Sequence, residues 1–180
     1  MTTVMPKVRS FSGRRVRHET ARSFDEVLAT LRTAVGDATR GELGAAVRDC
    51  GTQESFARRM QEVAGDSGFM LFFEMDHGAW LKTFGVRRKI VRWVFGNPII
   101  AYTMLRHDVA AGLFAPIEFV LIENESGHGS TLTYDLPSSL MVTIRLSWKQ
   151  PKPWIANWWS SLSASCEQLP VNCRSVAGQI

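Results

Sequence analysis

The stretch FFEMDHGAW at residues 72–80 decides how this sequence is expected to fold. It begins as an apolar run and then turns polar, and the stretch FGNP at residues 95–98 ends a second apolar run in a similar way. Asp76 and Asn97 are good helix caps, and Pro98 suits a first helical turn. The sequence therefore predicts two buried strands, each followed by a capped helix.

Hydrophobic periodicity places further elements around these two corners. A strand is expected near residues 13–20, and Ser23 with Glu26 forms a capping box for an amphipathic helix of about 12 residues. In the helix after Asp76, Trp80, Leu81 and Phe84 are expected to face the core. The other expected elements are strands at 69–75, 88–95, 116–123 and 130–136 and helices at 53–64, 77–84 and 98–106. This order predicts an α+β domain with a mostly antiparallel sheet and helices packed on one face.

The composition is that of a globular protein, with 180 residues of which 45% are hydrophobic and 21% charged. The net charge of +4 is unevenly distributed, because residues 77–107 carry six basic side chains and no carboxylate. Residues 23–76 and 108–135 are rich in acids. Either these segments neutralise one another in the folded chain, or the basic run forms a local anion site.

Several classes of partner and cofactor are not expected. No apolar run approaches the roughly 20 residues that span a membrane, and basic and aromatic residues are not interleaved as in nucleic-acid binding. The three cysteines have no metal-ligand spacing, and their odd number suits a reduced, cytoplasmic chain. Phosphate-binding loops and the common hydrolase and zinc motifs are also missing. We therefore expect no cofactor, no metal, no membrane and no nucleic acid.

Glu74, Asp76 and His77 are the residues that could carry out chemistry. A carboxylate beside an imidazole can fix its tautomer and prepare a general base, so His77 is the candidate catalytic residue and Glu74 or Asp76 would orient it. The structural alternative is that Asp76 caps the following helix. A metal site would need a fourth ligand, and three neighbouring residues at a strand end rarely converge.

The two capped corners also suggest a binding site. We expect both helix N-termini to lie at the same edge of the sheet, where they would attract an anion. The ligand would be a small molecule bearing a carboxylate, phenolate or phosphate. Its expected contacts are Asp76, His77, Lys82, Asn97 and Tyr134, the last as a half-buried tyrosine with its hydroxyl at the rim.

Four stretches carry a resemblance to a known family. They are Gly68-Phe69 through Glu74-x-Asp76-His77-Gly78, Phe95-Gly96-Asn97-Pro98, the strand after Pro116, and Thr133-Tyr134-Asp135-x-Pro137-Ser138. In this order and spacing, residues 13–142 resemble the domain-of-unknown-function 302 (DUF302) family. The resemblance implies a compact α+β domain of the TATA-binding-protein-like class, with helices packed across a curved antiparallel sheet. It also implies a homodimer, and it implies no established reaction.

The sequence departs from the family pattern in two segments. Residues 37–67 are polar and punctuated by glycines, and they form an insertion that is long for the family. Residues 143–180 are expected to be a divergent C-terminal extension with a tryptophan-rich helix, and residues 1–12 a flexible basic tail.

Three functions stay open at this point. The first is a cytoplasmic domain that binds a small polar or anionic molecule in a pocket between sheet and helices. The second is a cofactor-independent enzyme, an isomerase, cyclase or lyase, with His77 as the acid–base group. The third is an interaction module that dimerises through its sheet or its terminal helix.

Overall fold

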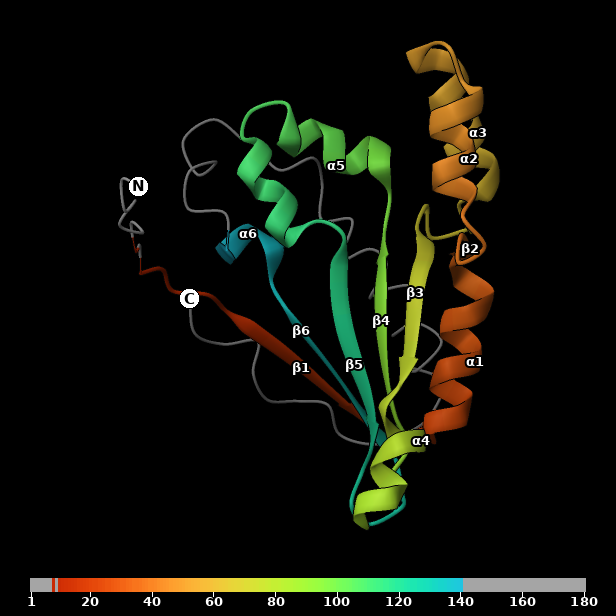
Figure 1. Cartoon of the computed structure of the whole chain (residues 1–180). Coiled ribbons are helices and arrows are strands. Elements are labelled where there is room, and N and C mark those ends of the chain that lie inside the picture. Colours follow the sequence, from red (N-terminus) through yellow and green to blue (C-terminus); the bar gives the residue numbers. More distant parts are fainter. Residues whose placement is uncertain (1–7, 9, 141–180) are drawn as a thin grey trace, which may run out of the picture. The chain divides into compact units, whose positions relative to one another are not determined.

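The computed structural model describes residue 8 and residues 10–140, and its centre is a six-stranded open sheet (Figure 1). The strand order is β1-β6-β5-β4-β3-β2, and all neighbouring strands are antiparallel except the parallel pair β2 and β3. The strands are β1 Arg15–Thr20, β2 Gly36–Asp37, β3 Met70–Asp76, β4 Ile90–Gly96, β5 Ile117–Glu123 and β6 Ser130–Asp135. The expected extension at 143–180 and most of the expected tail at 1–12 lie outside the described residues.

Helices complete the α+β fold that the sequence predicts. They are α1 Phe24–Ala34, α2 Glu42–Asp49, α3 Gln53–Val63, α4 His77–Leu81, α5 Pro98–Leu105 and α6 Pro137–Leu140, with 3-10 helices η1 Lys82–Phe84 and η2 Val109–Phe114. The expected strands and helices within the described residues occur near their predicted bounds. The elements β2, α2, η2 and α6 were not predicted; β2 and α6 are too short to show a period, and α2 lies in the glycine-punctuated segment that was expected to be an insertion. None of the described helices is long and apolar enough to cross a membrane.

The core lies between α1 and one face of the sheet. Alternate residues of β4, among them the fully buried Trp93, point to this face. The β4–β5 register sets Trp93 opposite Phe119, and the two rings pack with centroids 5.3 Å apart. Leu31 of α1 is also fully buried. The apolar side chains that alternate along β4 and β5, as predicted, therefore form the surface on which α1 packs.

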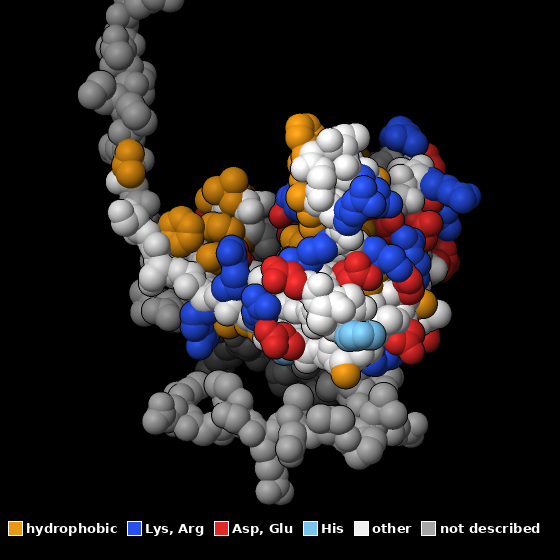
Figure 2. All heavy atoms as spheres, turned by 90° about the horizontal axis from the view of Figure 1, so that it is seen from below, with side chains coloured by type: hydrophobic (Ala, Val, Ile, Leu, Met, Phe, Trp, Pro, Cys, Tyr) orange, Lys and Arg blue, Asp and Glu red, His pale blue; other side chains and the backbone are white. Residues whose placement is uncertain are grey.

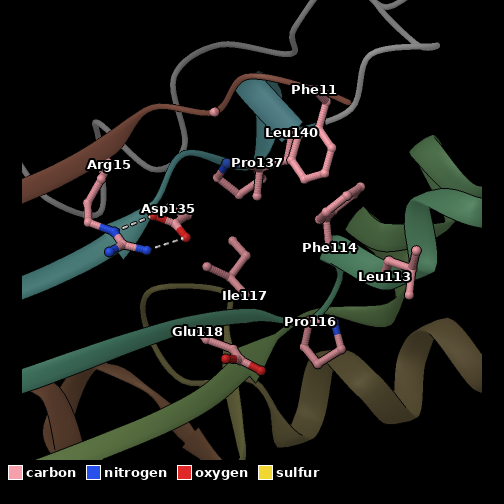
Figure 3. A pocket seen from close by; sticks show the side chains of 11 residues that line it. Phe11, Arg15, Leu113, Phe114, Pro116, Ile117, Glu118, Asp135, Pro137 and Leu140 are labelled. Atoms are coloured by element: carbon pink, nitrogen blue, oxygen red, sulfur yellow. Dashed lines mark hydrogen bonds and ion pairs between the residues drawn. The ribbon is translucent and has the colours of Figure 1, made fainter. Parts of the chain in front are cut away.

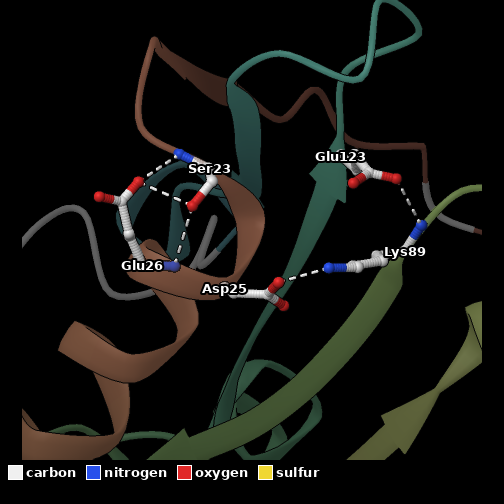
Figure 4. Close-up of polar contacts among 5 residues, drawn as sticks. All are labelled: Ser23, Asp25, Glu26, Lys89 and Glu123. Atoms are coloured by element: carbon white, nitrogen blue, oxygen red, sulfur yellow. Dashed lines mark hydrogen bonds and ion pairs between the residues drawn. The ribbon is translucent and has the colours of Figure 1, made fainter.

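The N-terminus of α1 is tied to the sheet by polar contacts (Figure 4). Ser23 and Glu26 form the predicted capping box, and the hydrogen bond from the Ser23 hydroxyl lowers the pKa of Glu26. Lys89, just before β4, forms an ion pair with Asp25, and its backbone N–H donates to the Glu123 carboxylate. The first turn of the helix is therefore held at the start of β4.

Three of the six basic residues at 77–107 form ion pairs with acids from other segments. The ion pairs are Arg88 with Glu125, Lys89 with Asp25 and Arg92 with Glu118. Figure 2 views the molecule from the end of the sheet that carries α4 and shows basic and acidic side chains interspersed. Mutual neutralisation, the first of the two interpretations of the charge pattern, therefore holds for these three basic residues.

The expected inward orientation of Trp80 and Phe84 is wrong. Their side chains are 49% and 76% exposed, because α4 and η1 lie beyond the end of the sheet. Trp80 packs instead in edge-to-face contacts with its neighbours, His77 at 5.9 Å and Phe84 at 6.0 Å between ring centroids. The apolar spacing was that of a helix, but no core lies beside this helix.

The segment 37–67 begins and ends at one tightly packed junction. The carbonyl of Phe69 accepts hydrogen bonds from the N–H groups of both Gly36 and Gly65, at 2.9 and 3.0 Å. A Cβ atom at Gly36 would lie 1.8 Å from the carbonyl oxygen of Val63. Gly36 is therefore needed for close backbone contact rather than as a left-handed helix cap, because α1 already ends in the extended Val35. Between its ends the segment adds a small core of its own, in which Ala38, Ala46 and Met60 pack with Met70.

Replacing Gly36 by alanine is expected to lower the free energy of unfolding by about 3 kcal/mol, because a backbone carbonyl would have to move to admit the methyl group. The matched control is Gly51→Ala, since a Cβ atom at Gly51 meets no atom within 4 Å. Urea denaturation of both variants checks this. Equal stability of the two variants would contradict the role given to the junction.

Candidate functional site

The two capped corners lie at opposite ends of the sheet. β3 and β4 are antiparallel, with Asp76 opposite Val91 and Met70 opposite Gly96. The chain therefore enters α4 at one end of the sheet and α5 at the other (Figure 1). At about 3.4 Å per strand residue the two corners are about 20 Å apart. The expectation that both corners share one edge is wrong, because successive antiparallel strands end on opposite sides.

Glu74 contacts α1 rather than His77. Its two carboxylate oxygens accept hydrogen bonds from Nη2 of Arg32, both at 2.7 Å, and Oε2 also accepts from the indole N–H of Trp93 at 2.7 Å. The Arg32 guanidinium lies over the Trp93 ring, 5.8 Å from its centroid. This contact fastens the last turn of α1 to β3 and β4.

Asp76 and His77 each make a local contact within the corner. Oδ1 of Asp76 accepts from the N–H of Ala79 at 2.9 Å, which is the capping role considered for it. Nδ1 of His77 accepts from the indole N–H of Trp80 at 3.2 Å. A neutral imidazole whose Nδ1 accepts must carry its proton on Nε2. Glu74, Asp76 and His77 therefore contact three different groups, and no hydrogen bond among the described residues joins them.

Asn97 caps α5 and connects it to the turn before β3. Its Oδ1 accepts from the N–H of Ile99, and its Nδ2 donates to the carbonyl of Gly68, both at 2.8 Å. Both ends of the amide are thus engaged in holding the backbone. Asn97 lies at the opposite end of the sheet from His77.

Lys82 and Tyr134 complete the set of predicted contact residues. Lys82 is exposed at the start of η1, in the same corner as Asp76 and His77. Tyr134 is half-buried in β6, as expected, with its ring stacked on His18 at 5.9 Å, and burial raises the pKa of its hydroxyl. The structure therefore brings together Asp76, His77 and Lys82, and it separates Asn97 and Tyr134 from them. Within the described part of the chain, no three His, Cys, Asp or Glu side chains gather to hold a metal ion.

A cavity that was not among the predicted sites opens where β5 and β6 diverge. β5 pairs with β4 from Ile117 onward but with β6 only from Phe119, opposite Tyr134. Asp135 pairs with β1 alone, so the sheet is split at this end. Figure 1 shows β5 leaving the β1–β6 pair toward the end that carries α5 and α6.

The cavity has a volume of about 560 Å³, and polar and apolar atoms line it in nearly equal shares (Figure 3). η2 and α6 form its walls beside the chain that leads into β1. Large apolar side chains remain exposed around it, with Phe11 57% and Leu113 83% accessible. Its apolar lining consists of Phe11, Leu113, Phe114, Pro116, Ile117, Pro137 and Leu140.

The polar part of this lining consists of Arg15, Asp135 and Glu118. Arg15 binds Asp135 through two parallel hydrogen bonds of 2.7 and 2.9 Å, and this contact lowers the pKa of the Asp135 carboxyl. Glu118 accepts hydrogen bonds from Nε and Nη2 of Arg92, and both go to its Oε2. One guanidinium and two carboxylates therefore line an otherwise apolar space.

A second cavity of about 490 Å³ lies beside the Arg32–Glu74 pair. Its apolar members Leu71 and Trp93 belong to the core, and Arg32 and Glu74 are already paired. This cavity offers fewer accessible apolar groups than the first, which makes the space between β5 and β6 the better candidate site.

The sequence did contain a weak signal for the larger cavity. The residues Val-Ala-Ala-Gly-Leu-Phe-Ala-Pro at 109–116 are apolar, yet they show neither a helical nor a strand period. Apolar residues outside regular elements commonly line a cavity or an interface. Pro116 and Pro137 flank the split, and a proline lacks the N–H group that strand pairing requires.

The fold and site together define an α+β domain with an open, mostly antiparallel sheet that is split at one end. A family model described as "Domain of unknown function DUF302" matches residues 47–149, more than half of the chain, so the chain belongs to the DUF302 family. Three chains of solved structures match, and one is an uncharacterized conserved DUF302 protein from Bacillus stearothermophilus. That protein is 13% identical, with a TM-score of 0.46, and the match covers 86% of this chain and 93% of that chain. No curated protein matches.

Replacing Asp76 by alanine is expected to lower the free energy of unfolding by about 1 kcal/mol, because the N–H of Ala79 would lose its partner. Asp76→Asn should keep most of this stability, since asparagine is an equally good cap. Urea denaturation measures the effect, with the exposed Asp66→Ala as control. A loss in Asp76→Asn as large as in Asp76→Ala would show that capping is not the role of Asp76.

His77 and His107 are expected to hold opposite tautomers when neutral. His77 accepts at Nδ1 and should carry its proton on Nε2, whereas His107 accepts at Nε2 from Arg106 and should carry its proton on Nδ1. Long-range proton–nitrogen NMR spectra distinguish the two forms. In Trp80→Phe the His77 ring should lose its single tautomer while His107 is unchanged. A proton on Nδ1 of His77 in the wild-type protein would contradict the Trp80 contact.

Proposed function

We propose that this DUF302 protein binds a small, largely apolar organic molecule in the cavity between β5 and β6. The observation that carries the proposal is the split of the sheet beyond the Phe119–Tyr134 pair, which leaves a space of about 560 Å³ lined by apolar side chains and a few charged ones. Ligand sites commonly have volumes of roughly 300–1,000 Å³ and mostly apolar walls with a few polar groups.

The exposed apolar side chains at the cavity support the same function. Leaving Phe11 and Leu113 in water is unfavourable by roughly 25 cal/mol per Å² of apolar surface, and a bound molecule would cover part of that surface. The cavity also has rigid walls on one side, because Ile117 and Glu118 belong to a strand held by β4. Bound molecules would therefore meet a largely preformed site.

This proposal differs from the one that the sequence suggested. The sequence favoured a polar or anionic molecule between two helix N-termini, and those N-termini are at opposite ends of the sheet. An acid–base role for His77 stays a prediction. It would require Nδ1 to leave the Trp80 indole or the proton to leave Nε2.

Binding can be tested with N-phenyl-1-naphthylamine, a neutral apolar molecule whose fluorescence rises in apolar surroundings. We expect saturable binding with one site per chain. Ile117→Trp should weaken the affinity at least about tenfold, because the indole would fill the centre of the cavity.

The control is Val47→Trp, which adds the same indole at an exposed position of α2 outside the cavity lining. It should bind the probe like the wild type. Thermal unfolding monitors that both variants are folded. The proposal fails if the wild type shows no saturable binding, or if folded Ile117→Trp binds as tightly as Val47→Trp.

A further inference from the structure

Among the described residues, the charged groups that line the cavity are the guanidinium of Arg15 and the two carboxylates of Asp135 and Glu118. The Arg15 guanidinium is paired, because its Nε and Nη2 bind the two oxygens of Asp135. A second charged group entering the cavity therefore meets this pair and the carboxylate of Glu118, whose partner Arg92 lies outside the cavity lining.

Glu118 keeps one oxygen available. Both donors of Arg92 bind Oε2, and no described residue donates to Oε1. The side chain is 51% exposed while Arg92 is 34% exposed and lies outside the cavity lining. Glu118 therefore presents a hydrogen-bond acceptor with negative charge beside the apolar walls of Pro116 and Ile117 (Figure 3).

We propose that the molecule bound between β5 and β6 carries a positive charge, an ammonium or guanidinium group, which binds Oε1 of Glu118 while its apolar part occupies the cavity. This inference rests on the proposed function and adds the chemical class of the ligand. A bound molecule that excludes water from the cavity lowers the local dielectric and strengthens the pairing of opposite charges.

An anionic ligand of the same shape is disfavoured at this site. It would bind the N–H groups of Arg15 that Asp135 leaves free, and there it would also face the carboxylates of Asp135 and Glu118. Like charges at such a contact reduce affinity, so selectivity arises from the repulsion of anions as well as the attraction of cations.

Three probes that share the same octyl chain separate the contribution of the head group to affinity from that of the apolar chain. Octylamine, which is protonated at neutral pH, octanoate and neutral octanol are each used to displace N-phenyl-1-naphthylamine. We expect the wild type to bind octylammonium at least about tenfold more tightly than octanoate, with octanol between them. Raising the ionic strength should reduce this difference and leave octanol unaffected.

Glu118→Gln tests the named residue, since the amide can still accept from Arg92 and the fold should be kept. The variant should lose most of the preference for octylammonium and bind octanol as the wild type does. Glu125→Gln is the control, because Glu125 is 88% exposed and lies outside the cavity lining.

The outcomes distinguish the two proposals. If octanol and the naphthylamine bind but octylammonium is not preferred over octanoate, or if Glu118→Gln keeps the preference, the ligand class is wrong and the cavity remains a binding site. If none of the alkyl probes displaces the naphthylamine and the naphthylamine itself does not saturate, the proposed function fails together with this inference.

Discussion

The antiparallel register of β3 with β4 is the constraint on which the placement of Glu74, Asp76 and Asn97 depends. It sets Glu74 opposite Trp93 and sends the two helix-capping corners to opposite ends of the sheet. With that register, Glu74 turns toward α1, where Arg32 and the Trp93 indole engage it. Glu74 and Asp76 are close in sequence, but one contacts the core and the other caps a helix. Their closeness in sequence therefore does not place them in one site.

The opposite end of the sheet shows how a cavity can arise from interrupted pairing. β5 and β6 are held together along most of their length, and β1 follows β6 as far as Asp135. Where β5 parts from β6, side chains from both faces of the sheet reach the same space, so apolar Ile117 and charged Glu118 line one cavity. A continuous sheet would have kept these neighbours on opposite faces.

Much of the fold could be predicted because it depends on local signals. The capping box of Ser23 and Glu26 and the alternation around Trp93 each require only a few neighbouring residues. The candidate site could not be predicted in the same way, because it depends on where pairing between β5 and β6 stops. Pro116 and Pro137 lie near that point but do not fix it, and the expected proximity of Asp76 to Asn97 did not follow the antiparallel direction expected of most strands.

The junction between Gly36 and Gly65 allows the segment 37–67 to differ in length without disturbing the sheet. Its two ends adjoin, since the carbonyl of Phe69 binds both glycine N–H groups. An arm that departs from and rejoins the sheet at one place can grow or shrink without shifting the register of β3, because loop closure depends only weakly on length. Changes in the length of this arm would thus affect its small core around Met60, while the rest of the sheet and its split end retain their geometry.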